Sequence, residues 1–77
     1  MRLDEVGVGI PVVIKEIHGT GALRRRILDM GMTPNTRIVI SGVASGGNPI
    51  EISVRGYELT MRLKDAQIIE VVKIHEG

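Results

Sequence analysis

Three adjacent arginines, Arg24 to Arg26, stand within the segment GALRRRILDMG and form the main charge run of the chain. Guanidinium groups bind carboxylates and phosphates, so the run could contact a nucleic acid or an acidic protein surface. On a helix that turns by 100° per residue, the apolar side chains of Leu23, Ile27 and Met30 share one side. The three arginines then spread over about 200° of the helix surface, so they cannot act as one patch.

Because the three arginines point in different directions from the helix, we expect their side chains to have different roles. In one interpretation, Arg24 and Arg26 lay their aliphatic stems over the apolar rim of the barrel. Arg25 is placed to form an exposed i,i+4 ion pair with Asp29, which would make this side of the helix simply solvated. The alternative is that Arg25 and Arg26 face an acidic surface on a partner protein, and the residues alone leave both interpretations open.

Other residues that could do chemistry lack a supporting motif. No cysteine is present, and His18 and His75 stand alone near the ends of predicted strands, without the spacing of a metal site. Sequence spacing leaves open a metal site formed by proximity across the barrel, for example with Glu16 or Glu76. No serine lies in a nucleophile elbow, and the loop 44–49 lacks the pattern of a phosphate loop. The sequence therefore predicts no catalytic residue, no cofactor and no metal ligand.

The composition predicts a single small domain over residues 1–77 with an aliphatic core, since 43% of the residues are hydrophobic and 1% are aromatic. A formal charge of +1 lacks the excess that phosphate binding usually requires. Single-strand binders also use several aromatic side chains, whereas Tyr57 is the sole aromatic residue and is expected in the core. Nucleic acid is therefore not an expected partner. No signal-peptide or membrane-spanning pattern appears, which favours the cytoplasm.

One helix, over about residues 21–30, is expected to position the arginines. Thr20 is a suitable N-cap, and Gly31 stands where a left-handed residue ends a helix. Met32 would then fold back onto Ile27. Before this helix, the sequence VVIKEIH at 12–18 predicts a strand with a bulge near its end.

Four further strands are predicted after the helix. The turn TPNT, with Asn35 at positive φ, leads to a strand at 37–43. Alternation predicts strands at 49–54 and 57–63, joined by a tight hairpin at Arg55 and Gly56. Lys64 and Asp65 are expected to turn the chain into a last strand. The predicted strands cover residues 12–18, 37–43, 49–54, 57–63 and 66–74. The expected fold is mainly β, a small five-stranded antiparallel barrel with one short inserted helix.

The blocks GALRRRILDMGMTPNT, NPIEISVRGYELTMR and AQIIEV resemble the FeoA family of ferrous iron uptake, over nearly the whole chain. The resemblance implies an SH3-like barrel with an inserted helix, and no catalytic or metal-binding residues. It also implies action on FeoB, a membrane transporter with a cytosolic GTP-binding domain. Two segments depart from the family pattern: Pro34-Asn35 replaces Pro-Gly, and the loop 44–49 lacks an apolar residue, a proline and a charge.

The sequence and the resemblance together predict a cytosolic, non-enzymatic accessory or regulatory module that contacts FeoB and does not insert into the membrane. The partner-binding residues expected from the helix and the loop are Arg25, Arg26, Ser45, Asn48 and Pro49. An open edge strand would also allow weak self-association. The second interpretation is an SH3-like regulatory domain related to the C-terminal domain of DtxR-type metal-dependent repressors.

Overall fold

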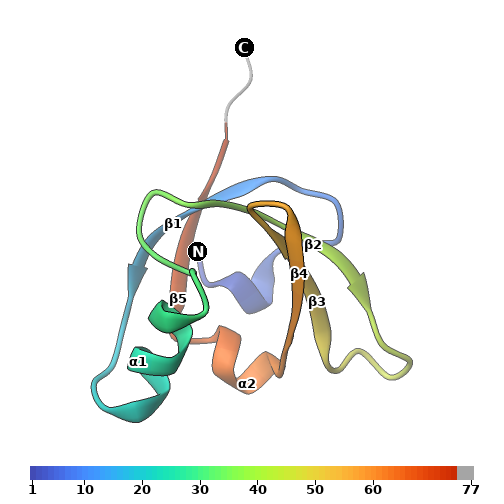
Figure 1. Ribbon diagram of the computed structural model, residues 1–77. Helices are drawn as coiled ribbons and strands as arrows, with labels where there is room; N and C mark the ends of the chain where they lie inside the picture. Colours follow the sequence, from blue (N-terminus) through green and yellow to red (C-terminus); the bar gives the residue numbers. More distant parts are fainter. Residues whose placement is uncertain (75–77) are drawn as a thin grey trace.

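A computed structural model describes residues 1–74 (Figure 1). It contains five strands, two α-helical segments and one 3-10 helix. In chain order these are η1 (Leu3–Glu5), β1 (Val12–Ile17), α1 (Ala22–Asp29), β2 (Arg37–Val43), β3 (Ile50–Val54), β4 (Tyr57–Met61), α2 (Leu63–Ala66) and β5 (Ile69–Lys73). No helix of the described residues is both long and apolar enough to cross a membrane.

The five strands form one antiparallel sheet in the order β4-β3-β2-β1-β5, which confirms the predicted fold class. The sheet curls over, and η1 and α2 lie beneath it between β5 and β4 (Figure 1). Since β4 and β5 are the two ends of the strand order, these short helices complete the barrel on that side. The interior that results holds one continuous cluster of buried aliphatic side chains.

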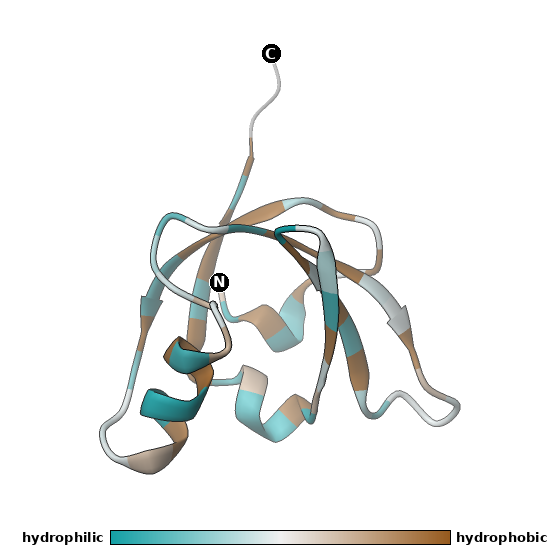
Figure 2. Cartoon of the chain, viewed as in Figure 1, coloured by the Kyte–Doolittle hydropathy of each residue, from teal (hydrophilic) through white to brown (hydrophobic). Residues whose placement is uncertain are grey.

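The alternation of each strand explains how this core is filled. In β3, Ile50, Ile52 and Val54 are buried, as the sequence predicts, whereas Glu51 is exposed. Figure 2 shows apolar and polar residues following one another along the strands and along α1. The core therefore consists of Ile, Val, Leu, Met and Ala side chains, with Thr36 as its one buried polar residue among those described.

The predicted bulge in β1 is confirmed. The register between β1 and β5 shifts between Ile14 and Glu16, so Lys15 is the extra residue. As a result Lys15 and Glu16 are both exposed, although they are neighbours in a strand. The bulge thus gives the outer face of β1 two adjacent charged side chains.

Helix α1 begins differently from the prediction. Gly21, not Thr20, is its N-cap, and no side chain caps the first turn. Gly21 has φ 89° and ψ −156°, a conformation that residues with a Cβ atom rarely adopt. The entry into α1 therefore depends on a glycine backbone rather than on a capping hydroxyl.

The end of α1 follows the prediction. Gly31 has φ 92°, and the amide of Met32 donates to the carbonyl of Ile27 at 3.3 Å. The amide of Gly31 donates to Leu28 at 3.0 Å, so both hydrogen bonds of a Schellman ending are present. Ile27 and Met32 are fully buried, and they anchor the helix end in the core.

The turns after α1 and β3 were also predicted correctly. Asn35 has φ 71°, and the amide of Thr36 donates to the carbonyl of Thr33, which closes the turn. Arg55 and Gly56 have φ values of 45° and 88°, as a two-residue hairpin of this twist requires.

The predicted boundaries near the C-terminus are wrong. Strand β4 ends at Met61, and residues 63–66 form the helical turn α2 instead of a strand end and a simple turn. The last strand accordingly begins at Ile69 rather than at Ala66. Neither α2 nor η1 was predicted, because a single helical turn is too short to show a hydrophobic period.

Tyr57 also departs from expectation, since its side chain is not in the core. The residue is 43% exposed, and its hydroxyl donates a hydrogen bond to the main-chain carbonyl of Met30. This bond joins the start of β4 to the end of α1.

Candidate partner-binding site

A groove of about 570 Å³ lies between α1, the loop before β3, the end of β4 and α2. Leu23 of α1 and Met30, the residue that follows this helix, supply apolar surface on one side, and Met61 of β4 supplies it on the other. Charged side chains of Arg26 and Arg62 stand on its rim. An apolar floor with a polar rim is the usual arrangement of a surface that binds another molecule.

The charges around this groove are only loosely paired. The guanidinium of Arg26 lies 3.7 Å from a carboxylate oxygen of Asp65, and the Arg26 side chain is 66% exposed. The Asp65 side chain is only 18% exposed, but at this distance and with a mostly exposed guanidinium the pair contributes little stability. The Arg26 side chain is therefore able to reorient towards an anionic group on a partner.

The loop before β3 forms another wall of the groove through Asn48 and Pro49. The side-chain carbonyl of Asn48 accepts a hydrogen bond of 3.1 Å from the amide of Leu63, the first residue of α2. Asn48 therefore connects the loop to α2 and holds two sides of the groove together. No hydrogen bond to a described residue uses its NH₂ donors, which remain available to a ligand.

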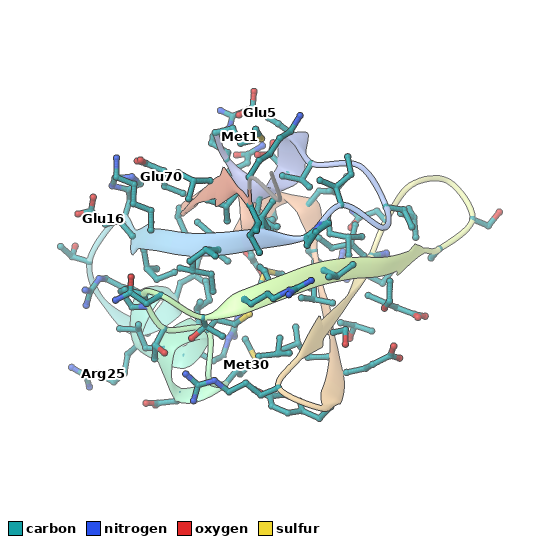
Figure 3. All side chains as sticks on the ribbon, turned by 90° about the horizontal axis from the view of Figure 1, so that it is seen from above. Met1, Glu5, Glu16, Arg25, Met30 and Glu70 are labelled. Carbon is teal, nitrogen blue, oxygen red and sulfur yellow. The ribbon has the colours of Figure 1, made fainter. Side chains whose placement is uncertain are left out.

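Three of the five residues predicted to bind a partner, Arg26, Asn48 and Pro49, line this one groove. Ser45 lies on the same loop but outside the groove lining. Arg25 projects from the other side of α1, away from the body of the protein (Figure 3). The two predicted arginines therefore lie on different sides of α1.

The second side is a hollow of about 550 Å³, lined by the end of β1, the loop 18–21 and one side of α1 from Arg24 to Asp29. Arg24 lies there, and its Nε donates to the carbonyl of Ile17 at 3.1 Å, which confirms that it is bound to the sheet rim. The expected ion pair between Arg25 and Asp29 is absent from the ion pairs of the described residues. Arg25 is exposed, and no ion pair among the described residues holds it.

A cluster of ligand-type side chains, Glu16, His18 and Glu70, stands beside this hollow and was missed by sequence reasoning. His18 Nε2 lies 2.7 Å from Glu70 Oε1, and His18 Nδ1 lies 4.0 Å from Glu16 Oε2. Lys15 Nζ is 3.3 Å from the other oxygen of Glu70. The hydrogen bond with His18, followed by that with Lys15, lowers the pKa of Glu70 below its usual value. The interpretation of His18 as an isolated histidine is therefore wrong.

The signal that could have revealed this cluster is the pairing of β1 with β5, which places Glu16 opposite Glu70. Sequence reasoning considered Glu16 and Glu76 as neighbours of a histidine but not Glu70. His75 and Glu76 lie outside the described residues.

The comparison with protein families identifies the chain. Residues 1–73 match the family model described as "FeoA domain". This chain belongs to the FeoA family. The matched residues include every residue that lines the groove and the Glu16–His18–Glu70 cluster.

One curated relative of this FeoA domain is the "Fe(2+) transport protein A/Fe(2+) transporter FeoB fusion protein" of Porphyromonas gingivalis (strain ATCC BAA-308 / W83). It is 35% identical over 71 residues, which cover 92% of this chain and 8% of the fusion protein. The chain thus spans a small part of that relative's length.

Solved structures show the same fold. The FeoA-like protein from Clostridium acetobutylicum is 36% identical with a TM-score of 0.91, covering 100% of this chain and 90% of that one. FeoA from Stenotrophomonas maltophilia, solved as a complex with zinc and described as an SH3 domain protein, is 21% identical with a TM-score of 0.79. That match covers 94% of this chain and 89% of the other. This FeoA domain therefore has an SH3-like fold.

The fold also occurs in IdeR from T. acidophilum, with a TM-score of 0.82 and 19% identity over 96% of this chain and 34% of that one. At this identity the likeness concerns the fold alone.

Proposed function

We propose that this FeoA domain is a cytoplasmic, non-enzymatic accessory module of ferrous iron uptake that acts by contact with the transporter FeoB. The observation that carries the proposal is the Porphyromonas gingivalis relative, in which a domain 35% identical to this chain belongs to one polypeptide with FeoB. Fusion holds two domains at a high effective concentration, so it is favoured where they work in contact. Two domains that work in contact need complementary surfaces.

The groove between α1, β4 and α2 is the surface best suited to this contact. It combines apolar side chains of Leu23, Met30 and Met61 with the exposed guanidinium of Arg26 and the unused amide donors of Asn48. Apolar anchors supply most of the affinity of an interface, and rim charges set the association rate and the choice of partner. The complementary surface on FeoB would carry an apolar side chain for the groove and a carboxylate for Arg26.

Arg25 and Ser45 extend the proposed contact beyond the groove. Arg25 projects from the solvent side of α1, and Ser45 is an exposed residue of the same loop as Asn48. A partner that covered the groove and the solvent side of α1 would bury both Arg26 and Arg25, whereas one confined to the groove would leave Arg25 in water. Separate charge reversals at the two positions distinguish these two footprints.

The test is a titration of the protein against the purified cytosolic GTP-binding domain of FeoB from the same organism, with and without guanine nucleotide. Affinity and GTP hydrolysis are followed together. We expect saturable binding that Arg26→Glu weakens about tenfold, a loss of about 1.4 kcal/mol of binding free energy. Lys73→Glu makes the same charge change on β5, outside the groove lining, and should leave the affinity unchanged.

Circular dichroism of each variant checks that it is folded. Absence of binding in every nucleotide state would refute contact with the GTP-binding domain, and equal weakening by Arg26→Glu and Lys73→Glu would refute the groove as the contact. The alternative function, a regulatory domain of a metal-dependent repressor, has only the shared fold of proteins such as IdeR in its support.

A further inference from the structure

The side chains of Glu16, His18 and Glu70 converge on the outer face where β1 meets β5 (Figure 3 labels Glu16 and Glu70). One ligand atom from each residue lies within 4.8 Å of the others. Glu16 and His18 are two residues apart and share a face, while the strand pairing places Glu70 directly opposite Glu16. The bulge at Lys15 sets this register, so the convergence is built into the sheet.

Two carboxylates directly opposite each other on paired strands repel, and a cation between them removes the repulsion. In this structure the imidazole of His18 and the ammonium of Lys15 take that position beside Glu70. His18 thus already lies between the carboxylates of Glu16 and Glu70, and Lys15 contacts Glu70 as well. A metal ion that replaced the proton between His18 and Glu70 would meet one nitrogen and one oxygen donor, and rotation of Glu16, which lies nearest to the other ring nitrogen, would bring a second oxygen.

We propose that Glu16, His18 and Glu70 form a binding site for a divalent first-row transition metal ion such as Zn²⁺. Imidazole together with carboxylates suits such ions, whereas Mg²⁺ and Ca²⁺ favour sites made of oxygen donors only. Tetrahedral coordination at the usual zinc distances needs ligand atoms about 3.4 Å apart. The side chains are 61%, 49% and 30% exposed respectively, so rotation can close the spacing and water can supply the fourth ligand.

Nearby positive charges limit the affinity of this site. Lys15 competes directly for Glu70, and Arg25 lines the hollow beside Glu16 and His18. Because Lys15 is 62% exposed and contacts Glu70 through its ammonium, its removal should free one carboxylate oxygen without disturbing the core. We therefore expect that loss of the Lys15 side chain strengthens the binding of zinc.

The experiment is isothermal titration of the 77-residue protein with ZnCl₂ at neutral pH, repeated with CoCl₂ to record the visible absorption of the bound ion. We expect one saturable site that His18→Ala and Glu70→Gln each weaken about tenfold or more. Lys15→Ala should tighten binding about threefold. His75→Ala removes the other histidine of the sequence and Glu58→Gln removes an exposed carboxylate on β4, so these matched controls should bind zinc like the unaltered protein.

Several results would overturn the proposal. They are no zinc binding up to about 1 mM, retention of full affinity in His18→Ala, or loss of affinity in His75→Ala. Equal affinity for Mg²⁺ and Zn²⁺ would also overturn it, because it would show that imidazole is not a ligand. Since zinc binding is measured without any partner, the outcome does not depend on the proposed contact with FeoB.

Discussion

Replacing Gly31 with alanine should destabilise the protein through two separable effects. At φ 92° a Cβ atom costs about 1 kcal/mol net, because left-handed strain of 1–2 kcal/mol is partly offset by the reduced entropy of the unfolded chain. The added Cβ would also lie 2.5 Å from the Tyr57 hydroxyl, which must therefore move. If the hydroxyl leaves the Met30 carbonyl, the lost hydrogen bond adds about 0.5–1 kcal/mol. The expected total is about 1.5–2 kcal/mol.

A double-mutant cycle separates the two effects. Tyr57→Phe alone should cost about 0.5–1 kcal/mol, since it removes only the hydrogen bond to Met30. In the Tyr57→Phe background, Gly31→Ala should cost only the backbone contribution of about 1 kcal/mol, because the obstructing hydroxyl is gone. Urea unfolding monitored by circular dichroism gives each free energy, and thermal midpoints should fall by about 4–8 °C per kcal/mol.

Gly46→Ala is the matched control for this cycle. Gly46 has φ 89°, and a Cβ atom there would meet nothing within 4 Å, so it reports backbone strain alone. Additive effects of Gly31→Ala and Tyr57→Phe, within about 0.3 kcal/mol, would refute the reasoning that Tyr57 holds β4 against the end of α1.

Two further variants test other parts of the groove. Asn48→Ala should lower the free energy of unfolding by about 0.5–1 kcal/mol, because it removes the acceptor for the Leu63 amide. Asn48→Asp keeps an acceptor and should lower it less. Chemical denaturation measures both changes. Ile27→Ala should cost about 2–5 kcal/mol because the side chain is fully buried beneath the groove, and a change below about 1 kcal/mol would show that the core collapses around the cavity.

The sequence was sufficient to predict the features that arise from neighbouring residues. Alternation identified the strands, Gly31 identified the end of α1, and Asn35 identified the turn that follows. Each of these depends on the conformational preference of a few adjacent residues, so no tertiary information is needed.

The features that were missed depend on residues far apart in the chain. The first turn of α2 is capped by Asn48, 15 residues before its first residue, so no local capping signal exists near Leu63. His18 and Glu70 are 52 residues apart, and only the register of β1 with β5 brings them together. A shift of that register by one residue would place Glu70 on the other face of the sheet. The bulge that fixes the register was foreseen, but its consequence for Glu70 required the pairing partner.

The arginine run shows why a motif read as a unit misleads. The fold gives each member a different environment: Arg24 is bound to the carbonyl of Ile17, Arg26 lines the groove beside Asp65, and Arg25 projects into solvent. Because 100° separates consecutive residues, α1 has the groove on one flank and the hollow beside the Glu16–His18–Glu70 cluster on the other. One short helix therefore separates two surfaces of different chemistry. Arg26 and Glu70 lie on opposite flanks, so a charge change at either one should leave binding at the other surface intact, and partner contact and metal binding are open to independent measurement.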